Sequence, residues 1–131
     1  MSRLFIITLL FISSLYADVI NISAKQLAEM QNNLLIVDIR TKPEWKETGI
    51  LAQSYPITFF QEDGSYNLQS FMEQIIKLNP KKEKALAILC RSGNRSVPVA
   101  DFLSQQGYKV YNVQRGIIEW KSQHHPVIPF R

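Results

Sequence analysis

The sequence is poor in cysteine, because Cys90 is the single cysteine among 131 residues. A lone cysteine excludes an internal disulfide. In an exported protein this is notable, since compartments outside the cytoplasm are oxidising and cysteines there usually pair. An unpaired thiol in such a protein is either buried by chance or kept for its reactivity. Cys90 is therefore the first candidate for a functional residue.

Long hydrophobic runs are also missing. A nearly unbroken apolar stretch, residues 4–12, is well short of the roughly 20 residues that a membrane-spanning helix needs. It follows a short basic start and precedes a segment that ends in the small residue Ala17, which is typical of a secretory signal peptide. We expect residues 1–17 to be cleaved, and residues 18–131 to be a periplasmic or secreted single domain without stable membrane association. The alternatives are that these first residues form a buried strand or an uncleaved membrane anchor.

The sequence also has no large excess of positive or of negative side chains. Without residues 1–17, which include one arginine, the chain has 14 basic and 11 acidic side chains and a net charge of +3. This excess is too small to indicate a nucleic-acid partner, and no basic stripe is interleaved with aromatic residues. It suits a small anionic substrate, because cationic groups around a cleft raise the local concentration of anions.

The remaining sequence alternates short apolar runs with amphipathic segments. Strands are predicted at residues 19–22, 34–37, 55–60, 85–89 and 110–113. Helices are predicted from the capping box at Ser23 to about Met30, from the capping box at Thr41 to Gly49, at 67–78, from about Val97 to Gly107, and briefly after Gly116. Strands that alternate with helices predict an α/β fold, with a parallel sheet covered on both faces.

Cys90 directly follows the predicted strand at residues 85–89, where ligands bind in such sheets. The polar loop after it contains Arg91, Ser92, Gly93, Asn94, Arg95 and Ser96. Backbone N–H groups of this loop and of the following helix start form an anion-binding arrangement that would stabilise a thiolate. Glycine permits the tight turn, and the two arginines add positive charge near an incoming anion.

This loop resembles the active-site loop of rhodanese domains. The resemblance continues in Asp38-Ile39-Arg40 followed by Glu44-Trp45 and Gly49, and in Gly107-Tyr108 followed by Gly116 and Trp120. These matches occur in order across most of residues 20–121. The resemblance implies a rhodanese-like α/β domain with about five parallel strands and helices on both faces.

The same resemblance implies a sulfurtransferase. Cys90 would take a sulfane sulfur from an anionic donor such as thiosulfate, hold it as a persulfide, and pass it to cyanide or a thiol. Arg91 or Arg95 would hold the donor, and a protein thiol is a further candidate acceptor. Neither a metal nor an organic cofactor is implied.

Other interpretations of the loop remain open. Cys90 would be a buried structural cysteine in the simplest of them. A persulfide carrier or redox partner without catalysis fits the same residues. A cysteine phosphatase or arsenate reductase fits less well. The active-site loop of those enzymes resembles a Cys-x5-Arg pattern, whereas Cys90 and Arg95 form a Cys-x4-Arg pattern. A shorter ring leaves less room for a tetrahedral phosphate.

Three further groups have two interpretations each. Asp38 and Arg40 either line the rim of the pocket or form a structural ion pair. Glu44 is better explained as a capping-box residue than as an acid catalyst. The adjacent pair His124-His125 favours a mobile surface tail over a metal site, since no Cys or carboxylate partner stands at ligand spacing.

Overall fold

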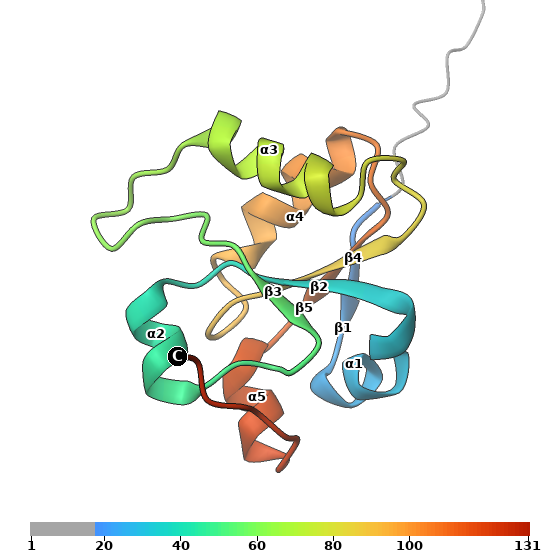
Figure 1. Ribbon diagram of the computed structural model, residues 1–131. Helices are drawn as coiled ribbons and strands as arrows, with labels where there is room; N and C mark the ends of the chain where they lie inside the picture. Colours follow the sequence, from blue (N-terminus) through green and yellow to red (C-terminus); the bar gives the residue numbers. More distant parts are fainter. Residues whose placement is uncertain (1–17) are drawn as a thin grey trace, which may run out of the picture.

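The computed structural model describes residues 18–131, which form one parallel β-sheet covered by helices (Figure 1). The predicted signal peptide lies outside the described residues. The strands are β1 (Ile20–Ile22), β2 (Leu34–Asp38), β3 (Ser54–Pro56), β4 (Ala85–Leu89) and β5 (Val110–Val113). The helices are α1 (Ala24–Met30), α2 (Lys42–Thr48), α3 (Leu68–Leu78), α4 (Ser96–Gln105) and α5 (Gly116–Ser122), with a 3-10 turn (Gln31–Asn33) after α1.

The described strands run parallel in the order β1-β5-β4-β2-β3. Helices α3 and α4 cover one face of the sheet, while α1 and α5 cover the other (Figure 1). One hydrophobic core contains Phe71 of α3 and Leu103 of α4, and the second contains Leu27 of α1 and Trp120 of α5. This arrangement confirms the predicted α/β class. Within residues 18–131, no helix is both long and apolar enough to cross a bilayer.

The two predicted capping boxes begin α1 and α2. In α1, Ser23 N–H donates to Gln26 Oε1 at 2.9 Å, and Gln26 N–H donates back to Ser23 Oγ at 3.2 Å. In α2, Glu44 Oε1 accepts hydrogen bonds from the backbone N–H and the hydroxyl of Thr41, at 3.4 and 3.1 Å. Asn67 likewise precedes α3 and accepts a bond from the backbone N–H of Ser70 at 2.9 Å. Local sequence therefore sets these helix starts.

The strand predicted at residues 55–60 is shorter and begins one residue earlier, as β3. It is an edge strand that pairs with β2. Pro56 has no N–H to continue the ladder, and such residues are confined to edges and strand ends. The backbone N–H of Ile57 still donates to the carbonyl of Asp38 at 3.0 Å. This bond keeps the following loop close to the carboxyl end of β2.

The C-terminal segment packs against the domain, so the mobile tail expected around His124 and His125 is wrong. Ile50 and Ile128 form an antiparallel bridge with N–H···O=C bonds of 2.9 and 2.8 Å. The His125 ring lies 4.6 Å from the Trp120 ring, measured between centroids. Among residues 18–131, no group of three or more His, Cys, Asp and Glu side chains is placed to hold a metal ion.

Candidate active site

Cys90 lies at the carboxyl end of β4, the central strand of the sheet. The loop of residues 91–95 then turns back, and α4 begins at Ser96 (Figure 1). Neighbouring strands β2 and β5 end at the same edge because all are parallel. The predicted loop is therefore located where open α/β sheets bind their ligands.

The sulfur of Cys90 has two close polar contacts. The side chain is almost fully buried, with 1% of its surface exposed. Its Sγ accepts a hydrogen bond from the Gly93 backbone N–H at 3.2 Å and donates one to Ser96 Oγ at 3.4 Å. The buried Ser96 hydroxyl donates in turn to the Gly93 carbonyl at 3.2 Å. Because a hydroxyl can rotate, Ser96 provides a second donor when the sulfur carries negative charge.

Helix α5 holds the carbonyl groups at the start of this loop. The backbone N–H of Ile117 donates to the Cys90 carbonyl at 2.9 Å, and that of Ile118 donates to the Arg91 carbonyl at 3.2 Å. In a planar trans peptide the C=O and N–H point in opposite directions. The N–H groups of these two peptide units therefore point away from α5, which leaves them available on the other side of the loop.

Two glycines permit this close packing. Gly93 has φ +94°, and a Cβ at this position would overlap the backbone carbonyl of Gln114. Gly116 has φ +55°, and its Cβ would overlap the carbonyl oxygens of Cys90 and Arg91. The closing pattern of the sequence pointed to Gly116, but its contact with the cysteine loop is evident only in the fold.

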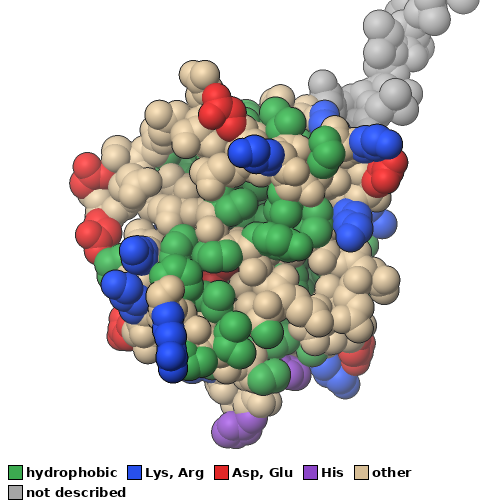
Figure 2. Space-filling model, viewed as in Figure 1, with side chains coloured by type: hydrophobic (Ala, Val, Ile, Leu, Met, Phe, Trp, Pro, Cys, Tyr) green, Lys and Arg blue, Asp and Glu red, His purple; other side chains and the backbone are tan. Residues whose placement is uncertain are grey.

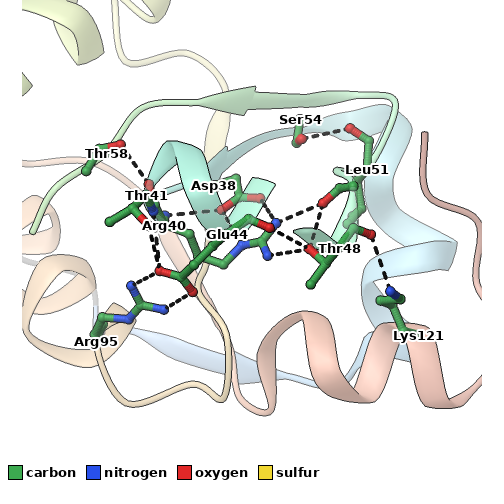
Figure 3. Close-up of polar contacts among 11 residues, drawn as sticks. Asp38, Arg40, Thr41, Glu44, Thr48, Leu51, Ser54, Thr58, Arg95 and Lys121 are labelled. Atoms are coloured by element: carbon green, nitrogen blue, oxygen red, sulfur yellow. Dashed lines mark hydrogen bonds and ion pairs between the residues drawn. The ribbon is translucent and has the colours of Figure 1, made fainter. Parts of the chain in front are cut away.

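Arg95 is paired with a carboxylate that the sequence interpretation assigned to helix capping alone. Its Nη1 and Nη2 atoms donate to Glu44 Oε1 and Oε2, each at 2.7 Å (Figure 3). Glu44 also accepts from Thr41, so one carboxylate begins α2 and fixes the loop arginine. Spacing gave no signal for this pair, since the two residues are 51 positions apart.

The pair changes the electrostatics of both partners. The hydrogen bonds from Arg95 are the main cause that lowers the pKa of Glu44, and burial opposes them. The hydrogen bonds to Glu44 likewise raise the pKa of Arg95. Glu44 therefore stays ionised at neutral pH. The guanidinium expected to hold a donor anion is already neutralised by a protein carboxylate.

Asp38 and Arg40 form a buried ion pair and line no part of the described cleft, which corrects their proposed place on its rim. Both side chains are 0% exposed. Arg40 donates from Nε and Nη2 to the two Asp38 carboxylate oxygens, at 2.9 and 2.7 Å. It also donates to Thr48 Oγ1 at 2.7 Å and to the Gly49 carbonyl at 3.1 Å (Figure 3). The pair is a brace between β2 and the end of α2.

The remaining loop residues differ in exposure. Arg91, Ser92 and Asn94 are exposed, whereas Gly93 and Ser96 are buried. Asn94 and Arg95 border an open cleft of about 880 Å³. The cleft is lined by Thr41, Pro43, Glu44, Glu47, Phe60, Gln61, Glu62, Gly64, Asn94, Arg95 and Pro98. Asn94 and Arg95 are the residues of the cysteine loop that line it, and the buried Cys90 does not.

The surroundings of this cleft are both charged and apolar. Figure 2 shows hydrophobic side chains gathered in the middle of the face and charged side chains around its edges, including the left side on which Figure 1 places α2. A smaller apolar hollow of about 300 Å³ shares Phe60 and Pro98 with the cleft, so the two adjoin.

Comparison of this sequence with known proteins identifies its family. The model of the rhodanese-like domain matches residues 23–123. A Rickettsia prowazekii protein of uncharacterised function is 34% identical over 105 residues, which cover 78% of this chain and 84% of that protein. A protein of Allochromatium vinosum named sulfurtransferase is 30% identical over 106 residues, which cover 80% and 87% of the two chains.

Solved structures agree with the sequence relatives. A rhodanese-related protein from Thermoplasma volcanium superimposes with a TM-score of 0.67 and 28% identity, over 83% of this chain and 97% of the other. This similarity covers nearly all of that protein and agrees with the α/β fold that the sequence motifs predicted. This chain belongs to the rhodanese-like domain family.

Proposed function

We propose that this protein is a sulfurtransferase that moves a sulfane sulfur from a donor such as thiosulfate to a thiol or cyanide through a persulfide on Cys90. The observation that carries the proposal is the position of the sulfur. Cys90 Sγ lies at the carboxyl end of β4, 3.2 Å from the Gly93 backbone N–H and 3.4 Å from the Ser96 hydroxyl oxygen.

The reaction has two steps. The Cys90 thiolate attacks the outer sulfur of thiosulfate, a new S–S bond forms at Cys90, and sulfite leaves with the electron pair of the broken bond. An acceptor thiolate then attacks the outer sulfur of the persulfide and releases the Cys90 thiolate. Gly93 N–H and Ser96 O–H are the donors that stabilise negative sulfur in both steps. Because the resting sulfur is only 1% exposed, each attack requires that the donor or acceptor gain access to a covered sulfur.

Two alternatives differ in how well the site supports them. A cysteine phosphatase uses its loop arginine to bind phosphate, whereas Arg95 is held by both oxygens of Glu44 and follows a short Cys-x4-Arg loop. A persulfide carrier without turnover requires the same buried cysteine and the same donors. Steady-state kinetics with small donors and acceptors separates the carrier from the enzyme, because a carrier stops after one equivalent of sulfur.

Mass spectrometry tests the proposal directly. Incubation with thiosulfate is expected to add one sulfur atom at Cys90, and cyanide is expected to remove it. Aryl phosphates are expected to remain intact. A protein that gains no sulfur from thiosulfate or from a low-molecular-weight persulfide, and in which Cys90 alkylates only after unfolding, would contradict the proposed mechanism.

A further inference from the structure

The ion pair of Arg95 and Glu44 is located on the wall of the cleft beside the cysteine loop. The two side chains are 31% and 24% exposed, so a ligand in the cleft reaches both of them. Bidentate arginine–carboxylate pairs are among the stronger polar contacts in proteins. The guanidinium of Arg95 is therefore bound to the Glu44 carboxylate before any substrate arrives.

This pairing matters most for a doubly charged donor such as thiosulfate. To use Arg95, the dianion must either displace Glu44 or bind beside its negative charge, and both are unfavourable. Two more carboxylates, Glu47 and Glu62, line the same cleft. Among the charged residues that line it, three are acidic and one is basic, and that one is already paired.

We infer that Glu44 is a specificity-determining residue that disfavours small dianionic sulfur donors and favours donors whose charge is balanced, such as the persulfide of a small aminothiol, in which an ammonium group balances the persulfide anion. This inference rests on the proposed sulfurtransferase function and names the donor class of the same site. Glu44 acts through Arg95 and does not itself react.

The favoured step needs no reactant other than the donor and water. The donor arrives as the charge-balanced ion, its persulfide group takes up a proton from water, and the Cys90 thiolate attacks the outer sulfur of the resulting R–S–SH group. A bond forms between Sγ and that sulfur, the S–S bond of the donor breaks, and R–S⁻ leaves with the electron pair. The products are the Cys90 persulfide, which retains the proton, and the thiolate of the small thiol, so atoms and charge balance.

The key variant is Glu44→Gln. Glutamine also serves in the third position of a capping box, so α2 keeps its start while Arg95 loses its ionic partner. Glu47→Gln is the matched control, because it removes a carboxylate from the same helix and the same cleft without freeing Arg95. Adding Arg95→Ala to Glu44→Gln tests whether any gain passes through the guanidinium.

The first measurement compares kcat/KM for persulfide formation with thiosulfate and with cysteamine persulfide, whose ammonium group balances its charge. Wild-type protein is expected to prefer cysteamine persulfide. Glu44→Gln is expected to lower KM for thiosulfate about tenfold with little change in kcat, and to leave cysteamine persulfide nearly unaffected. Glu47→Gln is expected to change KM less than about twofold, and Arg95→Ala is expected to cancel the gain.

A binding measurement keeps the test independent of catalysis. Calorimetric titration of thiosulfate into Cys90→Ser and into Cys90→Ser combined with Glu44→Gln is expected to show about tenfold tighter binding in the second protein. Equal thiosulfate affinities in these two proteins, or equal gains in Glu44→Gln and Glu47→Gln, would overturn the inference while leaving sulfur transfer intact. Failure of both donors to form a Cys90 persulfide would instead reject the proposed function, and the titration would still decide the role of Glu44.

Discussion

At the scale of single residues, the site depends on what surrounds one sulfur atom. Cys90 is buried, and its polar neighbours, Gly93 N–H and the Ser96 hydroxyl, are held in place by the loop itself. Helix α5 fixes the loop from outside through the Cys90 and Arg91 carbonyls. The proposed chemistry therefore uses both the cysteine and a backbone that approaches it closely.

The first prediction concerns Cys90. Cys90→Ser keeps nearly the same size but supplies a hydroxyl that cannot form a persulfide. Sulfur transfer from thiosulfate to cyanide is expected to fall to background, while the melting temperature stays close to that of wild type. A coupled assay for thiocyanate and thermal unfolding by circular dichroism measure the two effects. Retained transfer in Cys90→Ser would assign the sulfur chemistry to another group.

The second prediction concerns the loop backbone. Gly93→Ala is expected to lower the free energy of unfolding by at least about 2 kcal/mol, because the position has φ +94° and the new Cβ meets the Gln114 carbonyl. Gly64→Ala is the matched control, since its φ is +83° but no atom lies within 4 Å of the added Cβ. It is expected to cost only about 1 kcal/mol. Urea unfolding of both variants measures the difference, and similar losses would contradict the role given to close packing at Gly93.

At the scale of secondary-structure elements, polar contacts join segments that the hydrophobic cores do not connect. The buried pair of Asp38 and Arg40 links the end of β2 to the end of α2. The pair of Glu44 and Arg95 links the start of α2 to the loop before α4. Arginine side chains therefore contact both ends of α2, Arg95 through an ion pair at its start and Arg40 through hydrogen bonds at its end, while the buried Trp45 packs its middle.

The third prediction tests the buried brace. Arg40→Met leaves the Asp38 carboxylate buried without its partner, and breaking such a pair is expected to cost about 3–5 kcal/mol of unfolding free energy. Combining Arg40→Met with Asp38→Asn removes the stranded charge. The double variant is expected to be more stable than Arg40→Met alone, as measured by denaturant unfolding. A double variant less stable than the single one would show that the pair is not the main contribution of these residues.

At the scale of the whole molecule, the sheet separates two hydrophobic cores and presents the cysteine loop at one edge. The C-terminal segment returns to pair with Ile50, so residues beyond α5 belong to the packed domain. The close contact of Gly49 with the Ile128 carbonyl, where a Cβ would be 2.6 Å from the oxygen, shows how tightly this segment is seated.

The fourth prediction concerns export, which remains a proposal from the sequence. The apolar stretch at residues 4–12 and the small residue Ala17 predict cleavage after Ala17 and release of residues 18–131 as a periplasmic or secreted protein. N-terminal sequencing of protein from fractionated cells is the measurement. Protein that keeps Met1 in the membrane fraction would contradict cleavage.

The sequence by itself determined the features that depend on near neighbours. Apolar runs predicted the central strands, capping boxes predicted the starts of α1 and α2, and the loop after a buried strand identified Cys90. These patterns are readable because strand and helix periodicity and capping act over a few residues.

Only the tertiary structure decided which distant groups meet. It paired Arg95 with Glu44 across 51 positions, buried Arg40 completely, and placed Gly116 against the Cys90 carbonyl. Local spacing carries no signal for such contacts, because they form when packing of the sheet and helices brings remote segments together. The net charge around a bound substrate depends on all of these contacts together. The motif that contains Arg95 predicts a free positive charge, whereas the fold pairs that charge with Glu44 and neutralises it.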